Sequence, residues 1–526
     1  MTLFACNNAQ KSDKTTGEKG SIFYSEYDTP YGTPPFDRIT EDDYRPAFAY
    51  GMEQHIREID SIANNSEPPT FENTIVALDN SGTILDRVSA VFFGLEGAEK
   101  TDTIEQIANE ITPKLAAHND DIFLNQQLFN RIKTLYDDTA GLHLTTEQFQ
   151  LLDKYYKRFV RGGILLDEKS KERLREINKE LSSLTQEYGN NVLKETNNYK
   201  LVIDNKADLS GLPEGVIAAA AETAKNQGLD GKWVFTLQKP SWIPFLQYAD
   251  NRELREKLYK AMYMRGDNDN EFDNKEIVNK IVNLRIEKAK LMGFDTYADF
   301  SLQETMAKTP QAVYDLLNSI WKYALPQAKK EATELQALID QEGGNFKLES
   351  WDWWYYTEKL RKQKYNLEES ELKPYFKMEN VREGVFTVAN KLYGLNFKKL
   401  NNIPVYNPEV ETYEVTDADG SHIAIFYTDY FPRSGKSGGA WMSNFRDQQV
   451  LNGKDIRPLV YNVGNFTRPT NDTPSLLTLD EVETMFHEFG HALHGMLSKV
   501  NYKGISGTSV YRDFVELPSQ INEHWA

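Results

Sequence analysis

The sequence predicts a mainly α-helical protein with a small β-sheet in its C-terminal third. Apolar residues recur at spacings of three and four along much of the chain, which is typical of amphipathic helices. One segment instead carries two runs rich in β-branched and aromatic residues around a turn. The chain of 526 residues exceeds the size at which a single core stops growing, so we expect at least two lobes with a cleft between them.

The first twenty residues are expected to lie apart from this fold. The segment from Leu3 to Cys6 resembles the end of a bacterial lipoprotein signal, in which a small residue precedes a cysteine that becomes lipidated. Residues 7–20 then form a polar tether, so residues 1–20 are a signal remnant with a flexible linker. The alternative is a disordered tail with an incidental cysteine. The first interpretation predicts a periplasmic or lipid-anchored protein of the cell envelope, and the second a cytoplasmic one.

Composition narrows the classes of function. The formal net charge of −19 repels phosphate backbones, so we expect no nucleic-acid partner. No run of eighteen apolar residues is present, so we expect no transmembrane span. Cys6 is the only cysteine, which excludes a disulfide framework and thiolate metal sites, so any metal must be held by histidines and carboxylates.

Several helices can be placed from local signals. Thr40 is expected to cap a helix with Glu41, Asp42 and Asp43 in its first turn, where acidic groups suit the helix dipole. Two apolar stripes predict long helices, and the second is followed by a stop signal at Gly293. The stripes consist of Leu174, Ile177, Leu181, Leu184 and Tyr188, and of Ile277, Ile281, Leu284 and Leu291. We interpret both stripes as core packing.

The sheet is predicted from residues 405–415 and 422–430, which flank the turn residues Asp417 to Gly420 and form a β-hairpin. Residues 431–439 are expected to form a loop, and helical periodicity returns only at about Thr478.

The segment that carries chemistry is TLDEVETMFHEFGHALHGML, which starts at Thr478. Thr478 and Glu481 have capping-box spacing, and six residues form the apolar side: Val482, Met485, Phe486, Phe489, Leu493 and Leu497. His487 and His491 are four residues apart, so both imidazoles can reach one ion, with Glu488 beside them. In this H-E-x-x-H pattern the metal acidifies a water and the glutamate takes its proton. The alternative is a pair of histidines hydrogen-bonded in a core.

A catalytic zinc needs a third protein ligand. Glu516 is favoured because it lies among apolar residues on what we expect to be a second helix, disturbed by Pro518. Asp513, Glu523 and His494 remain alternatives, and His494 is more typical of a packed or second-shell histidine.

Five stretches resemble the zinc peptidase family of thimet oligopeptidase, neurolysin and bacterial dipeptidyl carboxypeptidase. They are PTFENTIVALDNSG from Pro69, ITPKLAAHNDDIF from Ile111, FYTDYFPRSGKSGGAWM from Phe426, HEFGHALHG from His487 and SGTSVYRDFVELPSQ from Ser506. The resemblance extends over nearly the whole chain after residue 20 and is strongest to dipeptidyl carboxypeptidases. It implies one zinc ion on His487, His491 and Glu516, with Glu488 as the general base.

The resemblance also implies an overall shape and a substrate. The family fold is a neurolysin-like, two-lobed helical ellipsoid with a deep channel, here a helical lobe over 21–340 and a catalytic lobe over 341–526. The channel admits unfolded oligopeptides, and the strand around Ile423 to Tyr427 resembles one beside the active site. We therefore expect substrate contacts from Ile423, Phe426, Tyr427, Arg433 and Gly439. The loop carrying Arg433, Lys436 and Gly439 either closes over the substrate or is a solvated turn.

We expect a monomeric zinc peptidase that releases C-terminal dipeptides. The alternatives are an endo-acting oligopeptidase of the same family and a non-catalytic, zinc-containing peptide-binding protein. The chain ends within helical sequence at Ala526, whereas family members continue with tyrosines and a histidine that stabilise the oxyanion. The catalytic lobe is therefore expected to be incomplete and the activity of this chain impaired.

Overall fold

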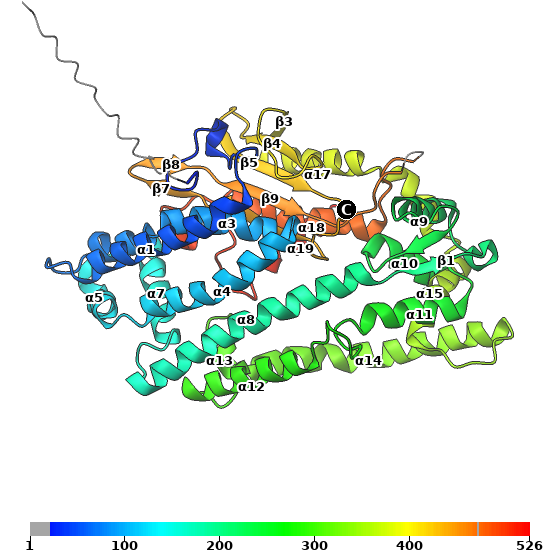
Figure 1. The fold of residues 1–526 in the computed structure, drawn as a ribbon, viewed down its shortest axis with the longest axis horizontal. Coiled ribbons are helices and arrows are strands. Elements are labelled where there is room, and N and C mark those ends of the chain that lie inside the picture. The colour runs from blue at the N-terminus through cyan, green and yellow to red at the C-terminus, as the bar shows by residue number, and fades with distance from the viewer. Residues whose placement is uncertain (1–20, 471–472) are drawn as a thin grey trace, which may run out of the picture.

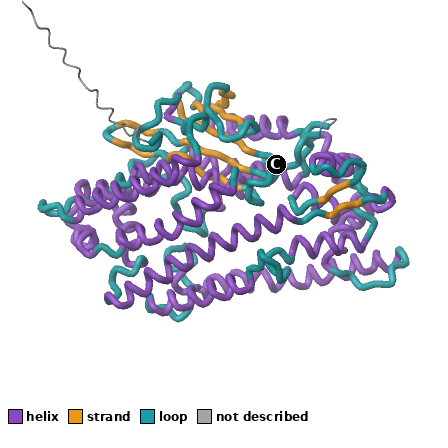
Figure 2. Tube along the Cα trace, viewed as in Figure 1, coloured by secondary structure: helices purple, strands orange, loops and turns teal. Residues whose placement is uncertain are grey.

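The computed structural model describes residues 21–470 and 473–526 and is mainly helical with small sheets (Figures 1 and 2). Cys6 and the predicted tether lie outside these described residues. The helices are α1 Tyr44–Ala63, α2 Ala77–Asp79, α3 Thr83–Ala98, α4 Asp102–Phe123, α5 Gln126–Asp137, α6 Thr139–Leu142, α7 Thr146–Arg161, α8 Glu168–Asn198, α9 Glu214–Asn226, α10 Lys239–Tyr248, α11 Arg252–Tyr263, α12 Lys275–Leu291, α13 Tyr297–Ser301, α14 Pro310–Gln341, α15 Ser350–Tyr365, α16 Glu369–Leu372, α17 Met378–Tyr393, α18 Leu479–Met496 and α19 Glu516–Glu523. The strands are β1 Leu201–Ile203, β2 Trp233–Phe235, β3 Asn396–Leu400, β4 Glu411–Thr416, β5 His422–Asp429, β6 Trp441–Arg446, β7 Gln449–Leu451, β8 Lys454–Ile456 and β9 Leu459–Val463.

The two predicted apolar stripes lie on α8 and α12 and pack against each other. Ile177 and Leu184 of α8 form one cluster with Ile277 and Leu284 of α12. The stripe prediction fails only at Tyr188, which is 41% exposed. In Figure 1, α12 lies at the bottom of the view, and α8 lies between it and the helices next to the main sheet.

The predicted helix start at Thr40 is also found. Thr40 precedes a single 3-10 turn, Glu41–Asp43, and Asp43 completes a capping box with it. The α-helix proper begins one residue later, at Tyr44, so the three acidic residues occupy the capping turn and not the first turn of α1.

The main sheet has five strands in the order β3-β4-β5-β9-β6. The predicted hairpin corresponds to β4 and β5, which pair antiparallel. Residues 431–439 form the predicted loop, and helix returns after Thr478 as predicted, but the sequence analysis missed β6 to β9, which lie between them. β9 pairs in parallel with β5 and antiparallel with β6, so two strands that the sequence analysis missed extend the sheet beyond the hairpin.

Helices cover both faces of this sheet. Ile425 and Tyr427 of β5 pack in one core with side chains of α1, α3 and α4. Ala424 and Phe426 point to the opposite face and pack with side chains of α17 and α18. This alternation follows the two-residue period of a strand, and it fixes α18 firmly against the sheet (Figure 1).

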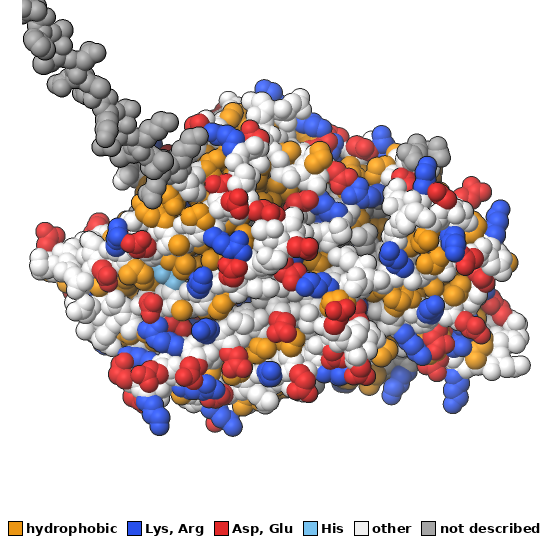
Figure 3. Space-filling view, viewed as in Figure 1, with side chains coloured by type: hydrophobic (Ala, Val, Ile, Leu, Met, Phe, Trp, Pro, Cys, Tyr) orange, Lys and Arg blue, Asp and Glu red, His pale blue; other side chains and the backbone are white. Residues whose placement is uncertain are grey.

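The surface carries mixed charge. On the face drawn in Figure 3, acidic and basic side chains are interspersed over the helices. Among the described residues, no helix combines the length and the apolar character needed to span a bilayer.

Candidate metal and catalytic site

The predicted motif helix is present as α18. Thr478 is its N-cap, and the Thr478 hydroxyl accepts a hydrogen bond from the Glu481 backbone at 3.1 Å. The Glu481 carboxylate in turn accepts a hydrogen bond from the Thr478 backbone amide at 2.8 Å, which completes the predicted capping box. Five of the six predicted apolar residues are buried, and only Leu497, at the C-cap, is partly exposed. Burial of this side leaves His487 and His491 together on another face of the helix.

The third group comes from α19, which begins at Glu516. The Glu516 Oε2 atom lies 3.2 Å from His487 Nε2 and 3.1 Å from His491 Nε2. The three possible ligand atoms all lie within 4.8 Å of one another. Pro518 is the third residue of α19, in the first turn that tolerates proline, so it does not disturb the helix as the sequence analysis expected.

The two helices approach closely because Gly490 faces α19. A Cβ atom at this position would lie 2.6 Å from Ser519 Cα, a distance that no side chain can occupy. Asn522 then donates a hydrogen bond to the Phe486 carbonyl at 2.5 Å and joins α19 to α18 next to His487. The spacing between Glu516 and the histidines therefore depends on backbone contact between the helices.

Glu488 occupies a buried position between the histidine face and the sheet. Its side chain is only 8% exposed, and its carbonyl accepts a hydrogen bond from Asn462 of β9 at 2.8 Å. Burial raises the pKa of Glu488 to about 7, with His487 opposing the rise and Glu516 adding to it. A carboxylate with such a pKa is suited to accept and return a proton near neutral pH.

The alternatives to Glu516 do not join His487 and His491 as a third ligand. Glu523 lies 2.6 Å from His487 Nδ1, on the side of the ring away from Glu516. Asp513 accepts hydrogen bonds from the backbone amides of Met306 and Ala307, at 2.8 and 2.9 Å. His494 Nδ1 is buried without a hydrogen-bond partner among the described residues. The structure thus brings Glu516 to the two histidines and places Glu523 behind one of them, a contact the sequence analysis did not foresee.

The predicted substrate contacts on β5 are not supported by the structure. Phe426 and Tyr427 are completely buried, one on each face of the sheet, so neither offers surface to a peptide. The carbonyl of Ile423 accepts a hydrogen bond from Arg457 at 2.7 Å. β5 pairs with β4 on one side and β9 on the other, so it has no free edge for strand addition. The sequence did not indicate that β9 covers this edge of β5, because β9 lies about thirty residues further along the chain.

The loop with Arg433 and Gly439 is anchored by buried ion pairs and is not a solvated turn. Arg433 forms ion pairs with Asp429 and Glu99, and Lys436 pairs with Asp429 at 2.6 Å in a fully buried contact. Gly439 has a φ of +92°, a left-handed conformation that favours glycine, and its carbonyl accepts a hydrogen bond from Asn465 at 2.7 Å.

The free edge beside the motif helix belongs to β6. Among the described residues, this strand has a sheet partner on one side only, β9. It packs directly on α18, since a Cβ at Gly495 would lie 2.4 Å from Met442 Cε. A peptide chain could therefore pair with β6 beside α18.

Comparison with known proteins identifies relatives of this chain. Residues 245–526 match the sequence profile of peptidase family M3. The chain is 41% identical to a dipeptidyl carboxypeptidase of Escherichia coli (strain K12) over 498 residues, which is 94% of this chain and 73% of that protein. It is 34% identical to oligopeptidase A of the same organism over 503 residues, 94% of this chain and 74% of that protein. A solved structure of an oligoendopeptidase F has a TM-score of 0.45 at 14% identity, over 87% of this chain and 64% of that one, a likeness too weak to support a conclusion.

Proposed function

The chain belongs to peptidase family M3, and from this premise we propose that it is a zinc peptidase that removes dipeptides from the C-termini of short, unfolded peptides. The observation that carries the proposal is the meeting of His487, His491 and Glu516 beside the buried Glu488. The alternative of two histidines hydrogen-bonded in a core does not explain why a carboxylate faces the Nε2 atoms of both.

The donor set fits zinc. Two imidazole nitrogens and one carboxylate oxygen are a ligand set of catalytic zinc sites, which keep a further position open. The contact between Glu523 and His487 Nδ1 favours the tautomer in which Nε2 carries the free lone pair, directed toward Glu516. Zinc held by these three residues would supply the Lewis acidity that activates water near neutral pH.

Glu488 supplies the acid–base chemistry. In the proposal its carboxylate accepts a proton from the attacking water and delivers it to the amine that leaves when the peptide bond breaks. The raised pKa of Glu488 makes both transfers feasible near neutral pH. The hydrogen bond from Asn462 to its carbonyl holds this turn of α18 against β9.

The substrate is proposed to lie extended along the free edge of β6 in a channel between two helical lobes, residues 21–340 and 341–526. Main-chain hydrogen bonds to β6 suit peptides of varied sequence, since they do not depend on side chains. We propose one zinc ion per chain and a monomeric enzyme. The cell-envelope location rests only on the sequence around Cys6 and stays a prediction.

The exo-acting mode can be tested with a ten-residue peptide. We expect the zinc-loaded protein to shorten it by successive C-terminal dipeptides, and we expect no such products from the same peptide with an amidated C-terminus. Mass spectrometry of the products distinguishes the two modes. Internal cuts in both peptides would contradict the exo-acting proposal and support the second candidate, an endo-acting oligopeptidase, which the similarity to oligopeptidase A favours. Binding without cleavage would support the non-catalytic peptide-binding protein.

The contact behind His487 predicts a loss of zinc affinity. Replacing Glu523 with Gln is expected to weaken zinc binding by about 10- to 100-fold, because a neutral amide holds the His487 Nδ1–H, and with it the ring orientation, less strongly than a carboxylate does. Competition with a chromophoric chelator measures this affinity directly. Glu483→Gln is the matched control, since Glu483 lies exposed on α18, one turn before His487. Equal zinc affinity in the two variants would show that Glu523 does not support the site.

A further inference from the structure

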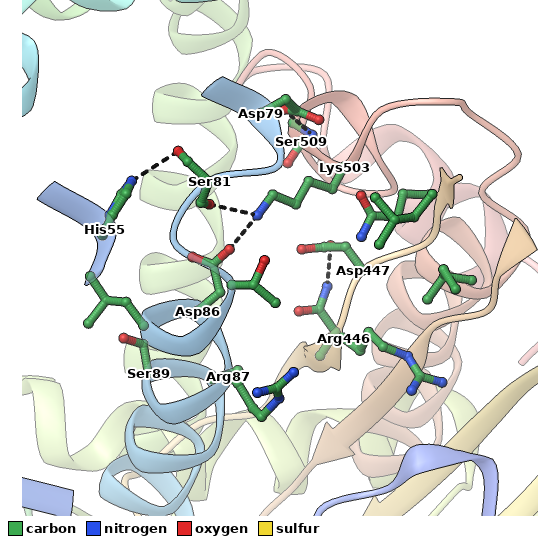
Figure 4. A pocket seen from close by; sticks show the side chains of 18 of the residues that line it. His55, Asp79, Ser81, Asp86, Arg87, Ser89, Arg446, Asp447, Lys503 and Ser509 are labelled. Atoms are coloured by element: carbon green, nitrogen blue, oxygen red, sulfur yellow. Dashed lines mark hydrogen bonds and ion pairs between the residues drawn. The ribbon is translucent and has the colours of Figure 1, made fainter. Parts of the chain in front are cut away.

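A pocket of about 700 Å³ lies beyond the end of β6 (Figure 4). Its walls come mainly from α1 to α4, α7, β6 and the segment that follows it, and the segment between α18 and α19. None of the residues that would hold zinc or transfer a proton lines it. Its volume is within the range typical of pockets that bind small ligands.

β6 leads from the candidate active site to this pocket. Met442 pairs with Asn462, whose side chain donates to the Glu488 carbonyl, so this part of β6 lies at the site. Arg446, at the other end of the strand, lines the pocket. The four residue steps from Met442 to Arg446 span roughly 13 Å at about 3.3 Å per residue. A peptide paired with β6 would therefore reach the pocket about four residues from the bond that is cut.

The basic groups of the pocket are already engaged or solvated. Arg446 donates to three main-chain carbonyls, and Arg87 donates to that of Phe23 at 2.8 Å. Lys154 donates to the carbonyls of Gly504 and Ser509, and Lys503 pairs with Asp86. Arg158 is exposed and stacks on the Phe123 ring. These contacts leave little reason for the pocket to select an anion.

Two carboxylates, in contrast, keep an unused oxygen. Asp447 Oδ1 accepts a hydrogen bond from Asn444 at 2.8 Å, and Oδ2 has no partner among the described residues. Asp79 is 1% exposed; its Oδ1 accepts from Tyr155 and Gly504, and its Oδ2 is buried with no partner in the described part of the chain. Burial raises the pKa of Asp447 to about 6 and also raises that of Asp79, as expected for carboxylates that lack cationic partners. Figure 4 shows both carboxylates near Lys503 and Asp86.

We propose that this pocket binds the free N-terminal ammonium group of the peptide substrate, through Asp447 Oδ2 and beside the unpaired Oδ2 of Asp79. The ammonium group offers three donors and a positive charge, which are what the unused carboxylate oxygens need. The inference rests on the proposed function, because it assumes that the peptide lies along β6. It adds a determinant of substrate length: short peptides that fill the distance from the pocket to the site bind best.

The test measures peptide affinity without turnover. The Glu488→Gln protein, loaded with zinc, is titrated by calorimetry with hexapeptides free of lysine and arginine, with a free or an acetylated N-terminus. We expect acetylation to weaken binding by about tenfold or more, since it removes a charged hydrogen bond. The further change Asp447→Asn should weaken only the free peptide and make the two affinities equal. Asp86→Asn is the control within the pocket, because its carboxylate is already paired with Lys503.

Each outcome has a consequence. Equal affinities of the free and acetylated peptides in the parent protein, or no binding of either, overturn the inference. An acetylation effect that survives Asp447→Asn, or that Asp86→Asn removes to the same extent, also overturns it, since the contact would then not be made by Asp447. If the protein with Glu488 intact does not cleave the free hexapeptide but acetylation still weakens binding, the proposed function fails and the ammonium site stands.

Discussion

Replacing Glu488 with Gln is expected to lower kcat by about 10²- to 10⁴-fold, the range typical for loss of a general base. Gln has nearly the same shape as Glu, so it can fill the buried position beside His487, but its amide cannot accept a proton from water. Steady-state hydrolysis of the ten-residue peptide measures kcat. Zinc affinity should change little, because Glu488 is not one of the three proposed zinc ligands, His487, His491 and Glu516.

The control for this result is Glu483→Gln, which makes the same chemical change on the same helix at an exposed position. It should retain the parent kcat. If the Glu488→Gln protein kept more than about a tenth of the parent kcat, Glu488 would not be the base and the acid–base part of the proposal would fail. A loss of zinc together with activity would instead indicate that the substitution disturbs α18.

Local sequence signals were enough to predict much of the site. The capping box at Thr478, the buried side of α18 and the pairing of His487 with His491 all depend on contacts within one helix. Glu516 could be favoured from its apolar neighbours, although its distance to the histidines is set by Gly490 and Asn522, which join two helices. The contact of Glu523 with His487 also depends on how α19 packs on α18, so the sequence did not indicate it.

The sheet was harder to predict because its pairing is non-local. The β4–β5 hairpin carries its own turn, so it could be found from the sequence. β9 pairs in parallel with β5 after a long connection, and no local pattern specifies that partner. Missing β9 led to the wrong expectation that β5 offers an edge to the substrate. The continuous apolar run from Ile423 to Tyr427 is a sequence signal of a strand covered on both faces, and the structure buries both Phe426 and Tyr427.

The largest expected effect on stability is at Asp429, at the end of β5. Its carboxylate is fully buried and accepts hydrogen bonds from Arg433, Lys436 and the Tyr406 hydroxyl. Burial would raise the pKa of Asp429, but the two cations hold it below its usual value. Replacing Asp429 with Asn is expected to lower the free energy of unfolding by about 3–5 kcal/mol, since it leaves Lys436 buried without a countercharge. Urea unfolding followed by circular dichroism measures this loss.

The pH dependence of that loss follows from Lys436. Burial lowers its pKa to about 8 even with Asp429 present, and removing the carboxylate must lower it further. Near pH 7 the unfolded variant then binds a proton that the folded variant tends to release, so the stability of the variant rises with pH. Above about pH 8 the folded parent has also lost this proton, so the difference between the two proteins should be smaller at pH 9 than at pH 7.

The matched control is Asp28→Asn, which removes one partner of the exposed ion pair between Asp28 and Arg38. Exposed pairs contribute little to stability, because water and salt screen them, so this variant should unfold close to the parent at both pH values. Equal effects of the two substitutions would mean that the contacts around Asp429 add no more than a surface pair. A larger effect at Asp429 would show that this network holds residues 431–439 in place, and with them the start of the β6 edge on which we propose the substrate lies.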